Sequence, residues 1–121
     1  MTFITGNSYT LICFFLKNHR MRSKYVICLD ENRPLLFFIN TNPSRLYPET
    51  QLQVTPSELP FLTHNSFIDT STPITCTLSK TCKIEKDHGQ VPDDIKDKIR
   101  HLVRNSDQLP ARHIEDILKA F

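Results

Sequence analysis

The sequence contains only two glycines, Gly6 and Gly89, in 121 residues. Loops that cradle phosphates with backbone N–H groups are built on several closely spaced glycines, in mononucleotide-binding and dinucleotide-binding proteins alike. The two isolated glycines therefore argue against a nucleotide cradle. The sequence also lacks the spacing of a calcium loop or of a zinc site, and no metal or cofactor is expected.

Closely spaced cysteine pairs are missing. The four cysteines, Cys13, Cys28, Cys76 and Cys82, include no pair at the short spacing of a zinc knuckle. Cys13 and Cys28 stand in apolar runs, where a free thiol packs like a small hydrophobic side chain. We therefore expect reduced, structural cysteines in a cytosolic protein rather than disulfides.

Long apolar runs are missing as well. The run LICFFL at 11–16 is too short for a membrane span or for the core of a secretory signal. A chain of 121 residues can bury a core without disulfides or metals. The sequence predicts one soluble, cytoplasmic domain, 1–121, with no membrane contact.

Acidic side chains are absent from the first 29 positions, whereas the same stretch carries the basic residues Lys17, Arg20, Arg22 and Lys24. From Asp30 onward, eleven basic side chains face thirteen acidic ones, so the net charge of +2 conceals a local cationic region. One interpretation is a solvated hairpin loop, which each basic residue taken alone favours. The other is a phosphate-binding rim beside a nucleic-acid groove, and the cluster as a whole leaves both open.

Aromatic and β-branched residues dominate the first third of the chain. The runs at 8–16, 24–30 and 34–41 are bounded by polar or proline signals and joined by short links, which predicts an antiparallel meander. Because these runs are apolar on both faces, we expect the central strands of a small curved sheet or barrel. Shorter strands are expected at 51–54, 66–71 and 74–80.

Helix signals come later. Thr55, Pro56 and Glu58 form a capping box, and Pro60 limits the helix that they begin to about one turn, near 56–61. From Pro92 the apolar spacing becomes that of an amphipathic helix, and a second helix is expected near Pro110. The predicted fold is a β-rich α+β domain, with the strands and the short helix in 1–90 and two helices in 91–121.

Thr41 ends the third predicted strand, between Asn40 and Asn42. These hydroxyl and amide groups could hold a phosphate, although threonine and asparagine before Pro43 also commonly initiate a turn.

The stretch THNSFIDTS, 63–71, gathers polar side chains around only two apolar ones. Histidine titrates near neutrality and suits proton transfer, yet a lone histidine such as His64 is more often a surface or turn residue. If Phe67 faces the core, strand alternation turns Asp69 inward, where it becomes a structural hub or a polar site residue. His64, Ser66 and Asp69 also admit a hydrolase triad, but no G-x-S-x-G elbow is present.

The order of these elements resembles the PemK/MazF toxin family. Gly6 precedes SYTLICFFL (8–16), RSKYVICL (22–29) stands in place of the second strand, and FFINTN (37–42) in place of the third. The resemblance implies an SH3-like barrel in which Arg22, or its neighbour Lys24, occupies the position of the catalytic arginine and Thr41 that of the catalytic threonine. Ser23 stands where the family has a proline.

The resemblance further implies a metal-independent endoribonuclease of a toxin–antitoxin or defence system, pairing as a homodimer and neutralised by an antitoxin. Arg22 would stabilise the charged phosphorane, Thr41 would orient the phosphate and His64 would move protons. Contacts to single-stranded RNA are expected from Lys17, Arg20, Lys24, Asn40, Asn65, Ser66 and Asp69.

The alternative hypothesis is a non-catalytic SH3-like barrel that binds a protein or nucleic acid through the same residues. Convergence of Arg22, Thr41 and His64 on one groove favours catalysis, and their dispersal favours binding.

Overall fold

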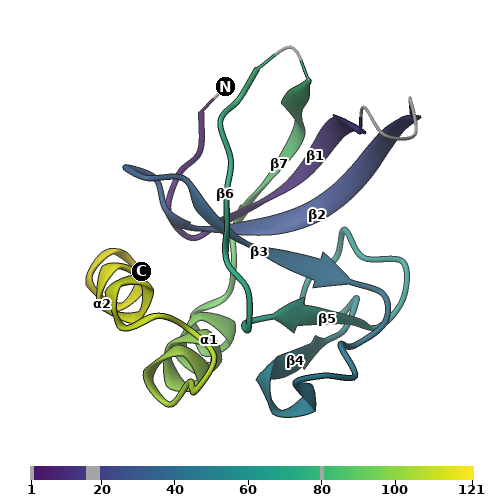
Figure 1. Ribbon diagram of the computed structural model, residues 1–121. Helices are drawn as coiled ribbons and strands as arrows, with labels where there is room; N and C mark the ends of the chain where they lie inside the picture. Colours follow the sequence, from purple (N-terminus) through teal and green to yellow (C-terminus); the bar gives the residue numbers. More distant parts are fainter. Residues whose placement is uncertain (1, 16–19, 80) are drawn as a thin grey trace.

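A computed structural model describes residues 2–15, 20–79 and 81–121 as an antiparallel sheet accompanied by two helices (Figure 1). The first three strands are β1 (Asn7–Phe15), β2 (Arg20–Asp30) and β3 (Leu35–Asn40). A 3-10 turn, η1 (Pro48–Thr50), precedes the short strand β4 (Gln51–Val54). The remaining elements are β5 (Ser66–Asp69), β6 (Ile74–Thr75), β7 (Cys82–Gln90), α1 (Asp93–Arg104) and α2 (Ala111–Ala120).

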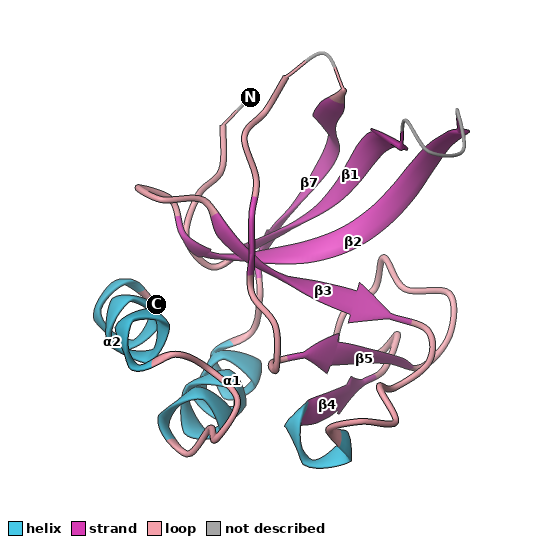
Figure 2. Ribbon diagram, in the orientation of Figure 1, coloured by secondary structure: helices cyan, strands magenta, loops and turns pink. Residues whose placement is uncertain are grey.

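The seven strands form one open sheet in the order β4-β5-β3-β2-β1-β7, and β6 pairs separately with β3. The meander predicted from the sequence is confirmed, because β1 pairs with β2 and β2 with β3, both antiparallel. The sheet bends strongly between its two halves (Figure 2). In the described residues no pairing joins β4 to β7, so the sheet does not close into a barrel.

Alternating residues of β2 and β3 belong to two hydrophobic cores on opposite faces of the sheet. Ile27, Leu29 and Phe37 belong to the larger core, which both helices and β4–β5 cover. Val26 and Leu36 belong to the smaller core, which the N-terminal segment and β1 complete. This alternation explains why the two strands are apolar on both faces, as the sequence indicates.

The two C-terminal helices are confirmed. Each begins after a proline, Pro92 or Pro110, whose fixed φ suits the start of a helix. Ile95, Ile99 and Val103 of α1 are buried, whereas Leu102 is half-buried. In the described part of the chain, neither helix is long and apolar enough to span a membrane.

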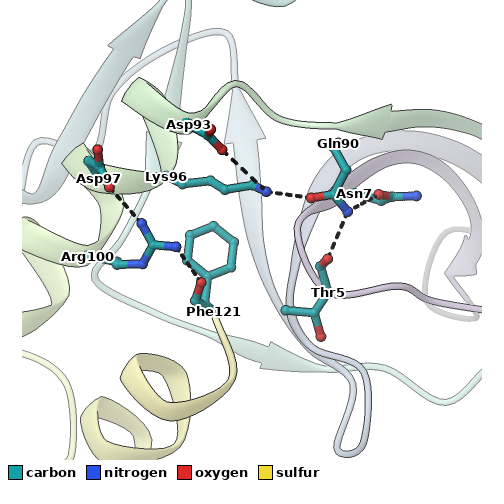
Figure 3. Close-up of polar contacts among 8 residues, drawn as sticks. All are labelled: Thr5, Asn7, Gln90, Asp93, Lys96, Asp97, Arg100 and Phe121. Atoms are coloured by element: carbon teal, nitrogen blue, oxygen red, sulfur yellow. Dashed lines mark hydrogen bonds and ion pairs between the residues drawn. The ribbon is translucent and has the colours of Figure 1, made fainter.

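Polar contacts attach α1 to the sheet and to the end of the chain (Figure 3). Lys96 donates to Gln90 at the end of β7, and Gln90 donates in turn to the backbone oxygen of Thr5 at 2.9 Å. Arg100 donates to the backbone oxygen of Phe121 at 2.6 Å, with its guanidinium 5.5 Å from the Phe121 ring. These contacts hold the helices against the larger core.

Two of the local predictions differ from the structure, and one strand was not predicted. The segment near 56–61 forms consecutive turns instead of a helix, although the capping contact between Thr55 N and Glu58 Oε1 is present at 3.1 Å. The strand expected at 74–80 is reduced to β6 and an isolated bridge at Ser79. β7 was not predicted, because CKIEKDHGQ is mostly polar and does not alternate cleanly.

Candidate functional site

The basic residues near the start of β2 lie on a strand instead of in a loop. Lys17 lies outside the described residues, and Arg20 is the first residue of β2. Arg22 is directly opposite Cys13 of β1, and Lys24 is opposite Leu11. β2 therefore begins earlier than the apolar pattern predicts, because the charged residues Arg20, Arg22 and Lys24 also pair with β1.

Strand alternation places Arg22 and Lys24 on the face that carries the smaller core. Leu11, the partner of Lys24, belongs to that core, and Nζ of Lys24 lies 5.7 Å from the centre of the Phe38 ring. Arg22 is exposed and Lys24 is half-buried. The ion pairs found among the described residues include neither of them, so no carboxylate there neutralises their charge.

Thr41 and His64 lie together just beyond β3. Oγ1 of Thr41 is 3.3 Å from Nε2 of His64, and Nδ1 of His64 is 3.0 Å from Oγ1 of Thr63. Both ring nitrogens thus contact a hydroxyl, and either tautomer can be accommodated because each hydroxyl can donate or accept. All three side chains are exposed, so this group is open to a ligand.

Arg22 is not among the side chains that hydrogen-bond to Thr41 or His64 in the described part of the chain. Thr41 lies in the bend after β3, whereas Arg22 lies on β2 and shares the face of Val26 in the smaller core. The structure therefore brings Thr41 and His64 together without Arg22.

Asn40 lies between these two groups. Asn40 pairs with Phe67 of β5. Tyr25 of β2 pairs with Ile39 of β3, and the same register places Lys24 beside Asn40. The start of β2 and the end of β3 lie on the same side of the molecule (Figure 1). We call this surface the β2–β3 rim, formed by Arg22, Lys24, Phe38, Asn40, Thr41 and His64.

The other predicted site residues of 63–71 differ in role. Ser66 and Ile68 are buried, so Phe67 and Asp69 point away from the larger core. Asp69 Oδ1 accepts from Gln51 Nε2 and from the backbone N–H of Ser71, both at 2.9 Å, which makes Asp69 a structural hub.

Ser66 and Asn65 flank the start of β5. The hydroxyl of Ser66 donates to the backbone oxygen of His64 at 3.1 Å and thereby shapes the turn before β5. Asn65 is exposed beside His64, where it remains available to a ligand.

His88 is half-buried and belongs to an aromatic cluster. It lies on β7, where its ring stacks on Phe61 with centroids 4.1 Å apart, and its Nε2 is 2.7 Å from Thr10 Oγ1. Desolvation, together with the nearby positive charge of Lys86, lowers the pKa of His88 from its ordinary value. Tyr25 completes the aromatic cluster at 5.1 Å from Phe61.

Three cysteines also meet, which the sequence did not indicate. Cys82 Sγ lies 2.6 Å from Cys13 Sγ and 3.6 Å from Cys76 Sγ, and all four cysteines are free. The pairing of β1 with the unpredicted β7 brings Cys13 to Cys82. Within the described ranges, no group of three or more His, Cys, Asp or Glu side chains is arranged to hold a metal ion.

Comparison of the chain with protein-family models, with curated proteins and with solved structures finds no match in any of the three. The resemblance to the PemK/MazF family thus rests on the residues that carry it in the sequence.

Proposed function

We propose that this protein is a binding module for single-stranded RNA and that the β2–β3 rim is its contact surface. One observation carries the proposal. One end of the rim combines positive charge with an aromatic ring, and the other end holds a hydroxyl group in contact with an imidazole.

The basic end of the rim suits a phosphate backbone. Arg22 is exposed and Lys24 lies over Phe38, so the two cations project from neighbouring positions of one strand face. Proteins that bind single strands combine positive charges that follow the backbone with aromatic rings on which bases stack. Lys24 and Phe38 supply one of each within a few ångströms.

The polar end of the rim suits bases and ribose. Thr41 and His64 offer a hydroxyl and an imidazole 3.3 Å apart, and Asn65 is exposed beside them. Unstacked bases and the 2′-hydroxyl are recognised through donors and acceptors of this kind. The 2′-hydroxyl contact would favour RNA over DNA.

The test is fluorescence anisotropy of a labelled, unstructured RNA titrated with protein over a series of salt concentrations. The double variant Arg22→Ala/Lys24→Ala removes both cations of the rim. The matched control Arg104→Ala/Lys119→Ala removes the same charge from exposed positions on α1 and α2. Circular dichroism checks that both variants fold.

We expect wild-type binding to weaken as the salt concentration rises. The rim variant should bind more weakly, and its slope of log K against log salt should be smaller in magnitude by about 1.4, because each of the two lost phosphate contacts on a single strand contributes roughly 0.7. The control should behave like the wild type. Equal losses in both variants would reduce the interaction to general charge attraction, and absence of binding by the wild type would reject the proposal.

A second candidate function is a metal-independent endoribonuclease, favoured by the contact between Thr41 and His64. In this hypothesis His64 takes the proton of the 2′-hydroxyl and Thr41 holds the phosphate. Among the described side chains, Arg22 makes no hydrogen bond to Thr41 or His64, which supports binding over cleavage, because phosphorane charge would need a cation beside Thr41. The hypothesis includes an SH3-like arrangement, a homodimer and an antitoxin partner.

Cleavage is tested by incubating RNA with protein in EDTA, comparing wild type with His64→Ala and with His101→Ala, which changes an exposed histidine on α1, as the control. Cyclic-phosphate ends that disappear only in His64→Ala would favour the enzyme, and expression of the wild type should then arrest growth. Intact RNA with retained binding would leave the binding module alone.

A further inference from the structure

The thiol groups of Cys13 and Cys82 lie in contact in the middle of a cluster that the RNA proposal does not use. We propose that Cys13 and Cys82 form a thiol–disulfide site whose substrate is a small-molecule disulfide, and that oxidation joins β1 to β7 through a cross-strand bond. This inference is independent of RNA binding.

Backbone register supports the pair. Cys13 and Cys82 are direct partners in the antiparallel pairing of β1 with β7. Direct partners in such a ladder have Cα atoms about 4.5 to 5.5 Å apart, which lies within the range that disulfides span. The bond therefore requires no displacement of either strand.

Access supports Cys82 as the thiol that reacts first. It borders a surface hollow of about 220 Å³ together with Leu78, Ser79, Lys83 and Ile84, through which a small disulfide can approach. Burial raises the pKa of both thiols, that of Cys13 to about 12. Because the thiolate is the reacting form, the exchange should accelerate as the pH rises.

The reaction has two exchange steps. The Cys82 thiolate attacks one sulfur of oxidised glutathione, which forms a mixed disulfide and releases one glutathione thiolate. The Cys13 thiolate then attacks Sγ of Cys82, which forms the Cys13–Cys82 bond and releases the second glutathione. Two electrons pass from the protein to glutathione, and the two thiol protons end on the two glutathione thiols.

Cys76 is the competing partner for the second step, since its Sγ lies 3.6 Å from that of Cys82. It belongs to no strand and faces no cysteine in a ladder, so its approach depends on the loop between β6 and β7. Cys13 is closer and is held by strand pairing, which favours it. Cys28 is fully buried and makes no contact with the other sulfurs among the described side chains.

The experiment treats the reduced, folded protein with oxidised glutathione, blocks the remaining thiols with iodoacetamide and identifies cross-linked tryptic peptides by mass spectrometry. Cleavage after Lys17, Lys24, Lys80 and Lys83 places the four cysteines in four different peptides. A cross-link between 1–17 and 81–83 is expected. Its formation should raise the Tm by about 10 °C, because the bond closes a loop between positions 69 apart.

Three variants make the assignment specific. Cys76→Ser should form the same cross-link, whereas Cys82→Ser and Cys13→Ser should not, and each should remain folded by circular dichroism. A cross-link of 46–80 to 81–83 in the wild type would overturn the choice of Cys13. Stable glutathionylation without a cross-link, or four free thiols after treatment, would overturn the site itself.

Discussion

The ring of His88 stacks on the ring of Phe61 with an interplanar angle of 13°, which joins the outer strand β7 to the loop between β4 and β5. These two residues come from opposite edges of the sheet, so their contact bridges the concave side of the bend. The ring also contacts Thr10, whose Oγ1 lies 2.7 Å from Nε2 of His88. The stack therefore stabilises the strongly bent form of the sheet.

Stability should decrease as the solution is acidified, in part because of His88. Its pKa in the folded protein is lowered below the ordinary value of 6.5, chiefly by desolvation, so the unfolded chain binds a proton more readily. The stabilising contribution is present above the ordinary pKa and is lost as the pH falls below it. Urea unfolding between about pH 7 and about pH 5 measures the effect.

His88→Phe should keep an aromatic ring beside Phe61 but lose this part of the pH dependence. His101→Gln, which changes an exposed histidine on α1, should retain it. Parallel pH profiles for His88→Phe and the wild type would assign the acid sensitivity to other groups.

Gly6→Ala should destabilise the protein more than Gly89→Ala. Both glycines have positive φ, at 91° and 82°, which costs an alanine about 1 kcal/mol or more. At Gly6 the added Cβ would also come within 2.5 Å of Gln90 Oε1, whereas at Gly89 it meets nothing within 4 Å. Thermal unfolding of the two variants gives the difference, and equal losses would mean that Gln90 moves away freely.

Ile99→Ala should cost about 3 kcal/mol of unfolding free energy, because it leaves a cavity in the larger core where Ile99 is fully buried. Leu46→Ala removes an apolar side chain that is 81% exposed and should change stability by less than about 0.5 kcal/mol. Chemical denaturation measures both. A small effect at Ile99 would contradict the packing of α1 against the sheet.

Asp69→Ala should lower stability by about 1 to 3 kcal/mol and leave RNA affinity unchanged. The substitution removes the carboxylate that accepts hydrogen bonds from Gln51 Nε2 and from the Ser71 N–H. Both donors then lose this hydrogen-bond partner. Asn65→Ala, at an exposed position, serves as the control for stability. Loss of RNA affinity in a folded Asp69→Ala variant would mean that Asp69 belongs to the RNA-binding surface.

Local patterns predicted most elements but few contacts. The edge strand at 51–54 and the helices after Pro92 and Pro110 were visible because their spacing or their proline signals are local properties. The candidate residues Thr41 and His64 were identified separately, yet their contact depends on how β3 and the loop before β5 approach each other. The apolar pattern began the second strand at 24, so the strand position of Arg20 was missed, because a run of basic residues resembles a loop until a pairing partner is known.

The sequence by itself determined a β-rich domain with two C-terminal helices, because apolar periodicity within a segment decides which face that segment must bury. Tertiary structure alone decided that β7 is a strand, since its polar residues gain backbone hydrogen bonds only through pairing with β1. The same pairing brought Cys13 to Cys82 and His88 to Thr10. Contacts between residues so far apart in the chain depend on strand register, which no local pattern contains.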